Sequence, residues 1–343
     1  MKRLSLYFRA PYDLEIREES LSPLATDQVL VQTLVSAISP GTELLVYRGQ
    51  VPRGIAVDET IDSLTDDFGY PLKYGYAAVG RVIAVGNQVE SAWHNRLVFA
   101  FNPHETHFVA SPADLIPVPA SITPETAAFL ANMETAVSFL MDGQPMIGEQ
   151  VAVFGQGIVG LLTTALLARH PLASLITLDR YPLRREWSCR LGAHACLDPS
   201  QPDVLDQLRR HLQGDRSYTG ADLAFELSGN PQALDQAIAS TGFNGRIVVG
   251  SWYGQKPATL NLGSHFHRSH MRLISSQVSH IAPRWRGRWS KNRRLQLAWT
   301  TLREQNPAAL ISHRFPFSRA PQAYQMLDQN PEAAIQIVLT YDV

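Results

Sequence analysis

The chain has 343 residues, 45% of them hydrophobic and 18% charged, with a formal net charge of -1. This length and composition are typical of a globular protein with two domains. The balanced charge excludes a general attraction to nucleic acid, and no apolar run approaches the roughly 18 residues of a membrane-spanning helix. Arg9 and Asp13 interrupt the apolar start that a signal peptide needs, so we expect a cytoplasmic protein with neither a nucleic-acid nor a membrane partner.

The first part of the chain is predicted to be rich in β-structure. Apolar and β-branched residues predict strands over 28–35, 78–86 and 96–101. Glycine and proline mark the turns between them, for example at Ser39-Pro40-Gly41. Thr123 followed by proline predicts the start of a helix over 124–139, because threonine caps helices and proline suits their first position.

From residue 151 onward, predicted strands and helices alternate. Strands are expected over 151–154, 174–178, 221–227, 246–250 and 272–276, and helices over 158–169, 182–190 and 232–240. This alternation predicts the α/β class and a Rossmann fold, which is a doubly wound parallel sheet. A helix near 320–327 and a strand over 335–339 follow, and we expect this tail to fold back onto the first domain.

A glycine-rich turn, Gly155-Gln156-Gly157-Ile158-Val159-Gly160, follows the first of these strands and opens the first helix. In this context the pattern predicts dinucleotide binding. The first glycine permits the turn, the second admits the pyrophosphate, and the third lets helix and strand pack closely. The N-terminus of the helix favours phosphate through its free N–H groups and dipole. A turn without a ligand, a flavin and S-adenosylmethionine are the alternatives.

Asp179 ends the next predicted strand, where an acidic residue binds the ribose hydroxyls of NAD. Its charge would repel a 2′-phosphate, which favours NAD over NADP. Arg180 follows directly and keeps NADP open, because an arginine can accommodate that phosphate. Ser228, just beyond one later strand, and Gly250, at the end of another, complete the expected cofactor site.

Only two cysteines occur, Cys189 and Cys196. Two cysteines do not make a disulfide framework, and they are too few for a four-cysteine zinc lobe. We therefore expect both to be small buried hydrophobic residues.

Three segments resemble the medium-chain dehydrogenase/reductase family: Val35 to Glu43, Lys73 to Gly80 and Ala131 to Thr135. The resemblance covers nearly the whole chain. It implies a β-rich GroES-like catalytic domain over 1–134, a Rossmann domain over 135–279, and a return segment over 280–343 that completes the catalytic domain.

Many members of this family bind zinc, and the resemblance places the ligand positions at Ser39 or Pro40, Tyr76, Ala77 and Ala131. None of these residues offers the thiolate, imidazole or carboxylate that zinc prefers. We therefore expect no metal, although Glu43 and Glu134 lie nearby and leave an unorthodox metal site open.

Within the family, the zinc-free branch of bacteriochlorophyllide a dehydrogenase-like proteins is the most similar. The resemblance lies in Ile38 to Glu43, Tyr70 to Tyr76 and Val79 to Val82. An insert from Pro52 to Asp67 carries five acidic residues and is expected near the substrate entrance. It leaves the identity of the substrate undetermined.

Without a Lewis acid, a side chain must stabilise the developing alkoxide and handle the hydroxyl proton. Tyr76 is the first candidate, because it occupies a ligand position, and Glu43 is the second. Thr135 matches a family threonine that contacts the nicotinamide, and His104 follows a strand on the expected active-site side. Packing or structural roles for Tyr76, Glu43 and His104 are the alternatives.

The sequence thus predicts a zinc-independent, NAD(P)-dependent alcohol dehydrogenase or carbonyl reductase with a small-molecule substrate. An NADPH-dependent alkene or quinone reductase and a non-catalytic dinucleotide sensor are the alternatives.

The family further implies a homodimer through the edge strand near 273–278. The basic stretch from Arg284 to Arg294 contains two tryptophans and is interpreted as a solvated helix start or as a contact for an anionic or planar substrate.

Overall fold

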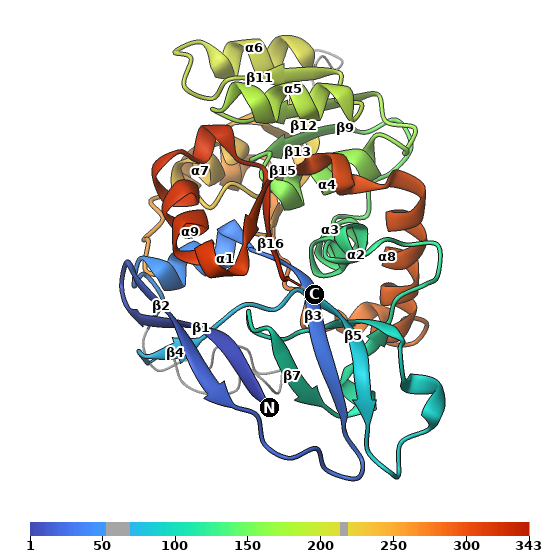
Figure 1. The fold of residues 1–343 in the computed structure, drawn as a ribbon. Coiled ribbons are helices and arrows are strands. Elements are labelled where there is room, and N and C mark those ends of the chain that lie inside the picture. The colour runs from blue at the N-terminus through green and yellow to red at the C-terminus, as the bar shows by residue number, and fades with distance from the viewer. Residues whose placement is uncertain (53–68, 213–218, 343) are drawn as a thin grey trace. The chain divides into compact units, whose positions relative to one another are not determined.

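A computed structural model describes residues 1–52, 69–212 and 219–342 (Figure 1). The chain divides into two compact units, one formed by Met1–Ala131 with Trp299–Val343 and the other by Asn132–Ala298. The second unit ends inside a helix, beyond the boundary that the sequence places after residue 279. The acidic residues of the predicted insert fall within 53–68 and lie outside the described residues.

The first unit is built on two β-sheets. A small sheet has the order β2-β1-β4, and a larger one has the order β15-β16-β3-β5-β6-β8, with β7 also paired to β3. The strands are β1 (Lys2–Ala10), β2 (Asp13–Ser20), β3 (Val29–Ala37), β4 (Leu72–Lys73), β5 (Ala78–Val85), β6 (Leu97–Ala100), β7 (His107–Ala110), β8 (Ile116–Pro117), β15 (Ile311–Pro316) and β16 (Gln336–Thr340). β16 runs antiparallel to β3, so the C-terminal segment completes this sheet.

Alternating burial along β3 explains how the larger sheet encloses a core. Val29 and Val31 are fully buried and pack with Val82, Val98 and Phe108 from neighbouring strands. Successive side chains of a strand point to opposite faces, so every second residue of β3 can face this core.

Among the described residues of the first unit, the helices that belong wholly to it are α1 (Pro40–Tyr47), α2 (Pro124–Ala127) and α9 (Ala320–Gln329). Short 3-10 turns lie at Ser91–Trp93, Pro112–Asp114, Pro307–Leu310, Phe317–Arg319 and Pro331–Ala333. The predicted cap is confirmed, because the Thr123 side chain accepts the N–H of Thr126 at 3.2 Å. The single helix predicted over 124–139 is wrong, because the chain forms α2 and then a separate helix, α3 (Leu130–Gly143).

The second unit contains a six-stranded sheet in the order β11-β10-β9-β12-β13-β14, and every neighbouring pair is parallel. Its strands are β9 (Gln150–Phe154), β10 (Ser174–Leu178), β11 (Ala195–Leu197), β12 (Ala221–Glu226), β13 (Thr241–Val249) and β14 (Arg272–Ser275). This order is that of the doubly wound Rossmann fold, so the predicted fold class is confirmed.

Helices cover both faces of this parallel sheet (Figure 1). Ala152 and Phe154 of β9 pack in the cluster that contains residues of α6 (Val204–His211) and α7 (Pro231–Ser240). Val151 and Val153 point the other way, into the cluster that contains residues of α3 and α4 (Ile158–Leu167). The remaining regular elements are α5 (Pro182–Arg190), α8 (Lys291–Gln305), a short π-helix (Leu262–Phe266) and a 3-10 turn (Pro283–Trp285). A sheet that is buried on both faces explains the nearly continuous apolar strands of the sequence.

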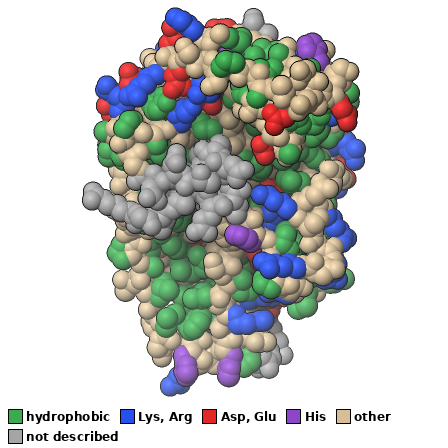
Figure 2. Space-filling view, turned by 90° about the horizontal axis from the view of Figure 1, so that it is seen from below, with side chains coloured by type: hydrophobic (Ala, Val, Ile, Leu, Met, Phe, Trp, Pro, Cys, Tyr) green, Lys and Arg blue, Asp and Glu red, His purple; other side chains and the backbone are tan. Residues whose placement is uncertain are grey.

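The described surface mixes residue types. On the face shown in Figure 2, Lys and Arg side chains lie among hydrophobic and neutral ones. Large exposed apolar residues include Tyr12, the adjacent pair Met146 and Ile147, and Phe243. Within the described residues, no helix combines the length and apolarity that crossing a membrane requires.

Candidate functional site

The glycine-rich turn of the second unit joins β9 to α4, and its first and third glycines are required by close backbone contacts. Gly155 has a φ of +93°, and a Cβ atom there would lie 2.6 Å from the backbone of Ser228. A Cβ at Gly160 would lie 2.0 Å from the carbonyl oxygen of Gly155. Any larger residue at either position would force the turn away from the strand or the helix.

Gly157 faces open space. It is the N-cap of α4 and has no side-chain cap, and among the described residues a Cβ there would meet the Arg184 guanidinium alone, at 4.0 Å. The N–H groups of the first helical turn lack partners within the helix and carry the positive end of its dipole. The turn therefore fits a phosphate group, with Arg184 as a nearby cation.

Asp179 lies directly after β10 and its two carboxylate oxygens bind different backbone groups. One accepts the N–H of Gln156 at 2.7 Å, and the other accepts the N–H of Tyr181 at 2.8 Å. Asp179 is 7% exposed, and the nearest guanidinium nitrogen, on Arg184, is 4.0 Å away. Burial lowers the pKa of Arg184, and the charge of Asp179 opposes that shift. Arg180 is exposed and stacks on the Tyr181 ring.

The other residues predicted in this turn shape it from within. The Gln156 side chain is fully buried, donates to the Gly155 carbonyl at 3.0 Å and accepts the Thr164 hydroxyl at 2.9 Å. Ile158 is buried, and Val159 packs against the cluster between the sheet and α3. Apart from the half-buried Val159 side chain, only backbone groups of these residues are therefore available to a ligand at the turn.

Ser228 binds a carboxylate that the sequence prediction missed, on Glu226, and the N–H of Gly250 binds the backbone carbonyl of the same residue at 3.0 Å. Glu226 ends β12 and is fully buried, and one of its oxygens accepts the N–H of Ser228 at 2.8 Å. The other oxygen accepts the hydroxyl of Tyr253, whose pKa is raised by burial and by Glu226. A Cβ at Gly250 would lie 2.4 Å from the Phe139 ring, so this glycine permits the packing of α3 against the sheet.

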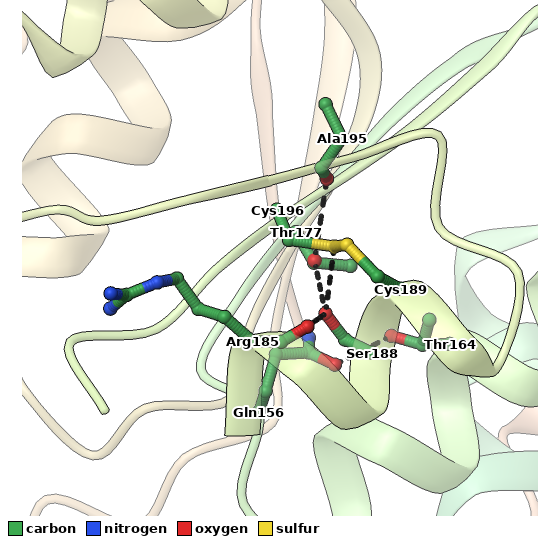
Figure 3. Close-up of a disulfide and its surroundings, with 8 residues drawn as sticks. All are labelled: Gln156, Thr164, Thr177, Arg185, Ser188, Cys189, Ala195 and Cys196. Carbon is green, nitrogen blue, oxygen red and sulfur yellow. Dashed lines mark hydrogen bonds between the residues drawn. A yellow bond between two sulfur atoms is a disulfide. The ribbon is translucent and has the colours of Figure 1, made fainter. Parts of the chain in front are cut away.

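The two cysteines form a disulfide, shown in Figure 3. Cys189 is exposed on the last turn of α5, and Cys196 is half-buried on β11. The prediction of two buried, unpaired cysteines is therefore wrong. The spacing of seven residues does not indicate a disulfide in the sequence. The two cysteines meet because the chain turns back after α5, so that β11 lies beside the end of the helix.

The first unit contains a buried polar cluster that includes two of the predicted catalytic residues. Glu43 and His104 are both fully buried, with 3.0 Å between a Glu43 carboxylate oxygen and His104 Nε2. The same oxygen accepts the hydroxyl of Tyr324 from α9, and the other oxygen accepts the N–H of Ser39 at 2.7 Å. α1 turns Glu43 inward, where three donors satisfy its carboxylate.

The cluster continues on the far side of the imidazole. His104 Nδ1 lies 2.7 Å from the Ser36 hydroxyl, which lies 2.8 Å from the hydroxyl of Tyr341. Burial raises the pKa of Tyr324 and of Tyr341, so both phenols keep their protons. Tyr324 donates to Glu43, and either hydroxyl of the Ser36–Tyr341 pair can be the donor. If His104 Nε2 donates to Glu43, Nδ1 accepts from Ser36, and Ser36 accepts from Tyr341. This arrangement gives each of these groups a partner of the opposite kind.

Tyr76 lies at the edge of this cluster and is half-buried. Its hydroxyl donates to the hydroxyl of Ser39 and lies 3.3 Å from that of Thr42. Ser39 connects Tyr76 to Glu43, because its backbone N–H binds the carboxylate. The structure thus brings together Tyr76, Glu43 and His104 within one unit.

Thr135 lies on α3 in the second unit and is half-buried. Its neighbour Glu134 is buried, and both Nε and Nη2 of Arg294 donate to one of its oxygens, at 3.1 and 2.8 Å. Arg294 is 1% exposed, and Arg284 pairs with Asp142 at 3.2 Å. The interpretation of the whole basic stretch as solvated or substrate-binding is therefore wrong at Arg294.

The positions that the resemblance aligns with zinc ligands hold a hydroxyl, a phenol and alkyl groups, at Ser39, Pro40, Tyr76, Ala77 and Ala131. Across residues 1–52, 69–212 and 219–342, no three His, Cys, Asp or Glu side chains gather as a metal site would require.

Comparison with known proteins gives a match over part of the chain. Residues 159–293 match a family described as zinc-binding dehydrogenase. D-guloside 3-dehydrogenase of Escherichia coli K12 is 24% identical over 337 residues, which cover 93% of this chain and 94% of that protein. The 2-desacetyl-2-hydroxyethyl bacteriochlorophyllide A dehydrogenase of Cereibacter sphaeroides is 24% identical, with 98% of each chain covered.

Two solved structures show the same fold. A crystal structure of a short chain alcohol dehydrogenase from Escherichia coli CFT073, complexed with the cofactor NADH, has a TM-score of 0.80 at 18% identity and covers 99% of both chains. The 2R,3R-butanediol dehydrogenase of Bacillus subtilis has a TM-score of 0.79 at 18% identity, covering 99% of this chain and 100% of that one. At this identity, the likeness establishes the fold.

Proposed function

We propose that this chain is an oxidoreductase that transfers a hydride between a nicotinamide dinucleotide and an alcohol or carbonyl compound. The turn from Gly155 to Gly160 carries this proposal, because it leaves helix N–H groups facing open space at Gly157, beside Asp179. The similarity to dehydrogenases over most of the chain supports the same reaction class. The bound nicotinamide would supply or accept the hydride.

NAD is the proposed cofactor form. A carboxylate has about four lone-pair sites, and the backbone N–H groups at Gln156 and Tyr181 occupy one on each oxygen of Asp179. The remaining sites can accept the ribose hydroxyls, and the nearly buried negative charge opposes a 2′-phosphate. The positive charges of Arg180 and Arg184 can attract a 2′-phosphate, so we expect NADP to bind more weakly than NAD but still measurably.

The reaction is proposed to proceed without zinc. The residues at the aligned ligand positions include none of the donors that zinc prefers. Glu43 and His104 could serve as donors by type, but their polar atoms are bound to each other and to Ser39, Ser36 and Tyr324. Glu134 is likewise paired with Arg294. The donor chemistry at these positions therefore does not fit a zinc ion.

We assign proton handling to Tyr76. Its half-buried phenol and the Ser39 hydroxyl form the most accessible part of the polar cluster. A hydroxyl pair can exchange a proton with a substrate alcohol and donate to a developing alkoxide. Glu43 and His104 are fully buried, so we assign them a positioning role behind Ser39. Thr135 is proposed to contact the nicotinamide.

The quaternary state is proposed to be a homodimer through β14. This strand ends the order of the parallel sheet, so one of its edges is free within the described unit, and Leu273 is 38% exposed on it. Edge strands with unpaired backbone groups can join a second sheet. Sedimentation of the purified chain would test this assignment.

The cofactor assignment is tested by titrating the purified chain with NADH and NADPH. We expect Asp179→Ala to weaken NADH binding about tenfold or more and NADPH binding less, because charge-assisted hydrogen bonds to the ribose are lost. Asp179→Asn keeps the shape and separates charge from packing. Asp203→Ala, an exposed acid of the same unit, is the control. Equal losses for both nucleotides would contradict the ribose role, and a wild-type chain that binds neither would contradict the proposed function.

The reaction class is tested with panels of alcohols, carbonyl compounds, alkenes and quinones. We expect dinucleotide-dependent turnover of at least one alcohol or carbonyl compound. Turnover of quinones or alkenes alone would instead establish a reductase of the alternative class. Tight dinucleotide binding without turnover of any compound would favour a sensor.

A further inference from the structure

The disulfide lies next to the proposed dinucleotide site and joins two elements that flank Asp179. α5 starts three residues after Asp179 and ends at Arg190, while β11 is the edge strand beside β10. The Cys189–Cys196 bond ties the last turn of α5 to this edge strand (Figure 3).

α5 has little apolar burial to hold it in place. Within this fully described nine-residue helix, the buried residue is Ser188, a polar side chain. Apolar burial is the main force that fixes a helix against a sheet, so polar contacts and the disulfide carry much of the attachment here. Breaking the disulfide should therefore loosen α5 more than it would a helix with an apolar face.

Polar contacts connect the disulfide to the middle of the helix. The Ser188 hydroxyl lies 3.3 Å from Cys196 Sγ, 2.7 Å from the Thr177 hydroxyl and 3.1 Å from the Arg185 carbonyl. Figure 3 shows Ser188 between the strands and the helix backbone. Its position thus depends on how closely α5 and β11 approach each other.

Arg185 carries the connection to the acidic residue. Its guanidinium donates to the Asp179 carbonyl and to the Arg180 carbonyl, both at 2.8 Å, and pairs with Asp198 at 3.1 Å. The N–H of Asp179 donates to the carbonyl of Leu197, the last residue of β11, at 3.2 Å. The backbone around Asp179 is therefore held from both elements that the disulfide joins.

From this continuous set of contacts we infer that Cys189 and Cys196 form a reversible redox site that sets the dinucleotide affinity of this unit. The inference rests on the proposed function, because it concerns the same cofactor site. With the disulfide formed, α5 and Asp179 are already ordered when the dinucleotide arrives. With the thiols reduced, binding must also order them, which lowers affinity.

The redox step is thiol–disulfide exchange with a small disulfide such as oxidised glutathione. The thiolate of exposed Cys189 attacks one sulfur, forms a mixed disulfide and releases one glutathione thiolate. The thiolate of Cys196 then attacks Cys189 Sγ and releases the second glutathione. Two protein thiols are oxidised to one disulfide, one glutathione disulfide is reduced to two thiols, and the two protons go to the released thiolates.

The experiment compares the full chain in its two redox states. Oxidised protein and protein reduced with a phosphine and then alkylated are titrated with NADH and NADPH, and intact mass confirms zero or two alkyl groups. We expect reduction to raise the Kd for the preferred nucleotide about fivefold, within the usual range of coupling between sites. Cys189→Ser combined with Cys196→Ser should bind like the reduced chain and show no response to phosphine.

An unchanged Kd in the two states would overturn the inference while leaving the proposed function intact. Failure to form the disulfide at any ratio of oxidised to reduced glutathione would also overturn it. If neither redox state binds a dinucleotide, the proposed function fails as well. Reduced protein without alkylation serves as a second reduced sample, so that an effect of the alkyl groups is recognised by comparison.

Discussion

The glycine turn of the second unit and the Glu43 cluster of the first unit are both candidate functional regions, but they are built in opposite ways. The turn requires residues without a side chain, because a Cβ at Gly160 would lie 2.0 Å from a backbone oxygen. The cluster depends on side chains that satisfy one another, from Ser36 through His104 and Glu43 to Tyr324. The turn is encoded within six consecutive residues, whereas one bond of the cluster spans 281 positions.

The largest effect is expected at the turn. Gly160→Ala places a methyl group against the Gly155 carbonyl, so we expect it to destabilise the chain by about 3 kcal/mol or more and to abolish dinucleotide binding. Urea unfolding and nucleotide titration would measure both effects. Gly263→Ala is the matched control in the same unit, because a Cβ there meets no atom of the described chain within 4 Å. Equal stability of the two variants would show that the turn tolerates a side chain.

Tyr76, at the accessible edge of the cluster, is expected to affect mainly kcat. We expect Tyr76→Phe to lower kcat about 100-fold, the usual contribution of a positioned proton donor, with little change in nucleotide affinity. Ser39 would keep its backbone N–H bond to the Glu43 carboxylate in this variant. Tyr12→Phe, at an exposed tyrosine of the same unit, is the control. An unchanged kcat would remove Tyr76 from the mechanism.

The buried part of the cluster should contribute to stability. Glu43→Gln keeps the shape but replaces one carboxylate oxygen with a donor facing Ser39, His104 or Tyr324. We expect the free energy of unfolding to fall by about 2 kcal/mol, because a buried donor loses its acceptor. Glu90→Gln, at an exposed position, should change it by less than about 0.5 kcal/mol. If the two variants lowered the free energy of unfolding by similar amounts, the hydrogen bonds of Glu43 would not contribute to the stability of this unit.

The smallest effect concerns pH. Burial alone would raise the pKa of Glu19, but hydroxyl donors from Tyr7 and Ser5 and the nearby charges of Lys73 and Arg3 lower it to about 2. A lowered pKa stabilises the fold above the unfolded value of 4.5, and this contribution is lost as the pH falls toward about 2.

Glu19 is partly solvated, so we expect its contribution at neutral pH to be about 1 kcal/mol. The difference in unfolding free energy between the wild type and Glu19→Gln should therefore shrink as the pH is lowered from 5 to about 2. A difference that stays constant with pH would show that packing rather than charge explains the effect of the variant.

The second unit was largely predictable because its signals are local. The bounds expected for β10 and α5 agree with the structure, and the strand order follows the alternation of strands and helices. The first unit was less predictable. β2 has no fully buried residue, so its sequence lacks the alternation that marks a strand. The residues Ser39-Pro40-Gly41 indicate a turn, but in the structure they begin α1, because serine and proline also suit a helix N-terminus.

Among the site residues, the sequence pointed to Tyr76, Glu43 and His104 one by one but not to their contacts with each other. Glu226, Tyr324 and Tyr341 gave no signal, because a single carboxylate or tyrosine at the end of a strand or within a helix is common. Arg294 was interpreted as part of a basic surface, although its charge neutralises buried Glu134. An arginine with an acidic partner 160 positions away cannot be distinguished from a solvated one in the sequence.

The sequence by itself determined the Rossmann sheet and the glycine turn, because strand periodicity, helix starts and the contact between Gly160 and Gly155 are set by residues close together in the chain. Only the tertiary structure decided the polar cluster behind Ser39, the ion pair of Arg294 and the Cys189–Cys196 bond. The polar cluster and the ion pair depend on which distant donor meets which acceptor, and the disulfide depends on how a helix folds back onto its next strand. These contacts are determined by tertiary packing, which brings together side chains that are separated along the sequence.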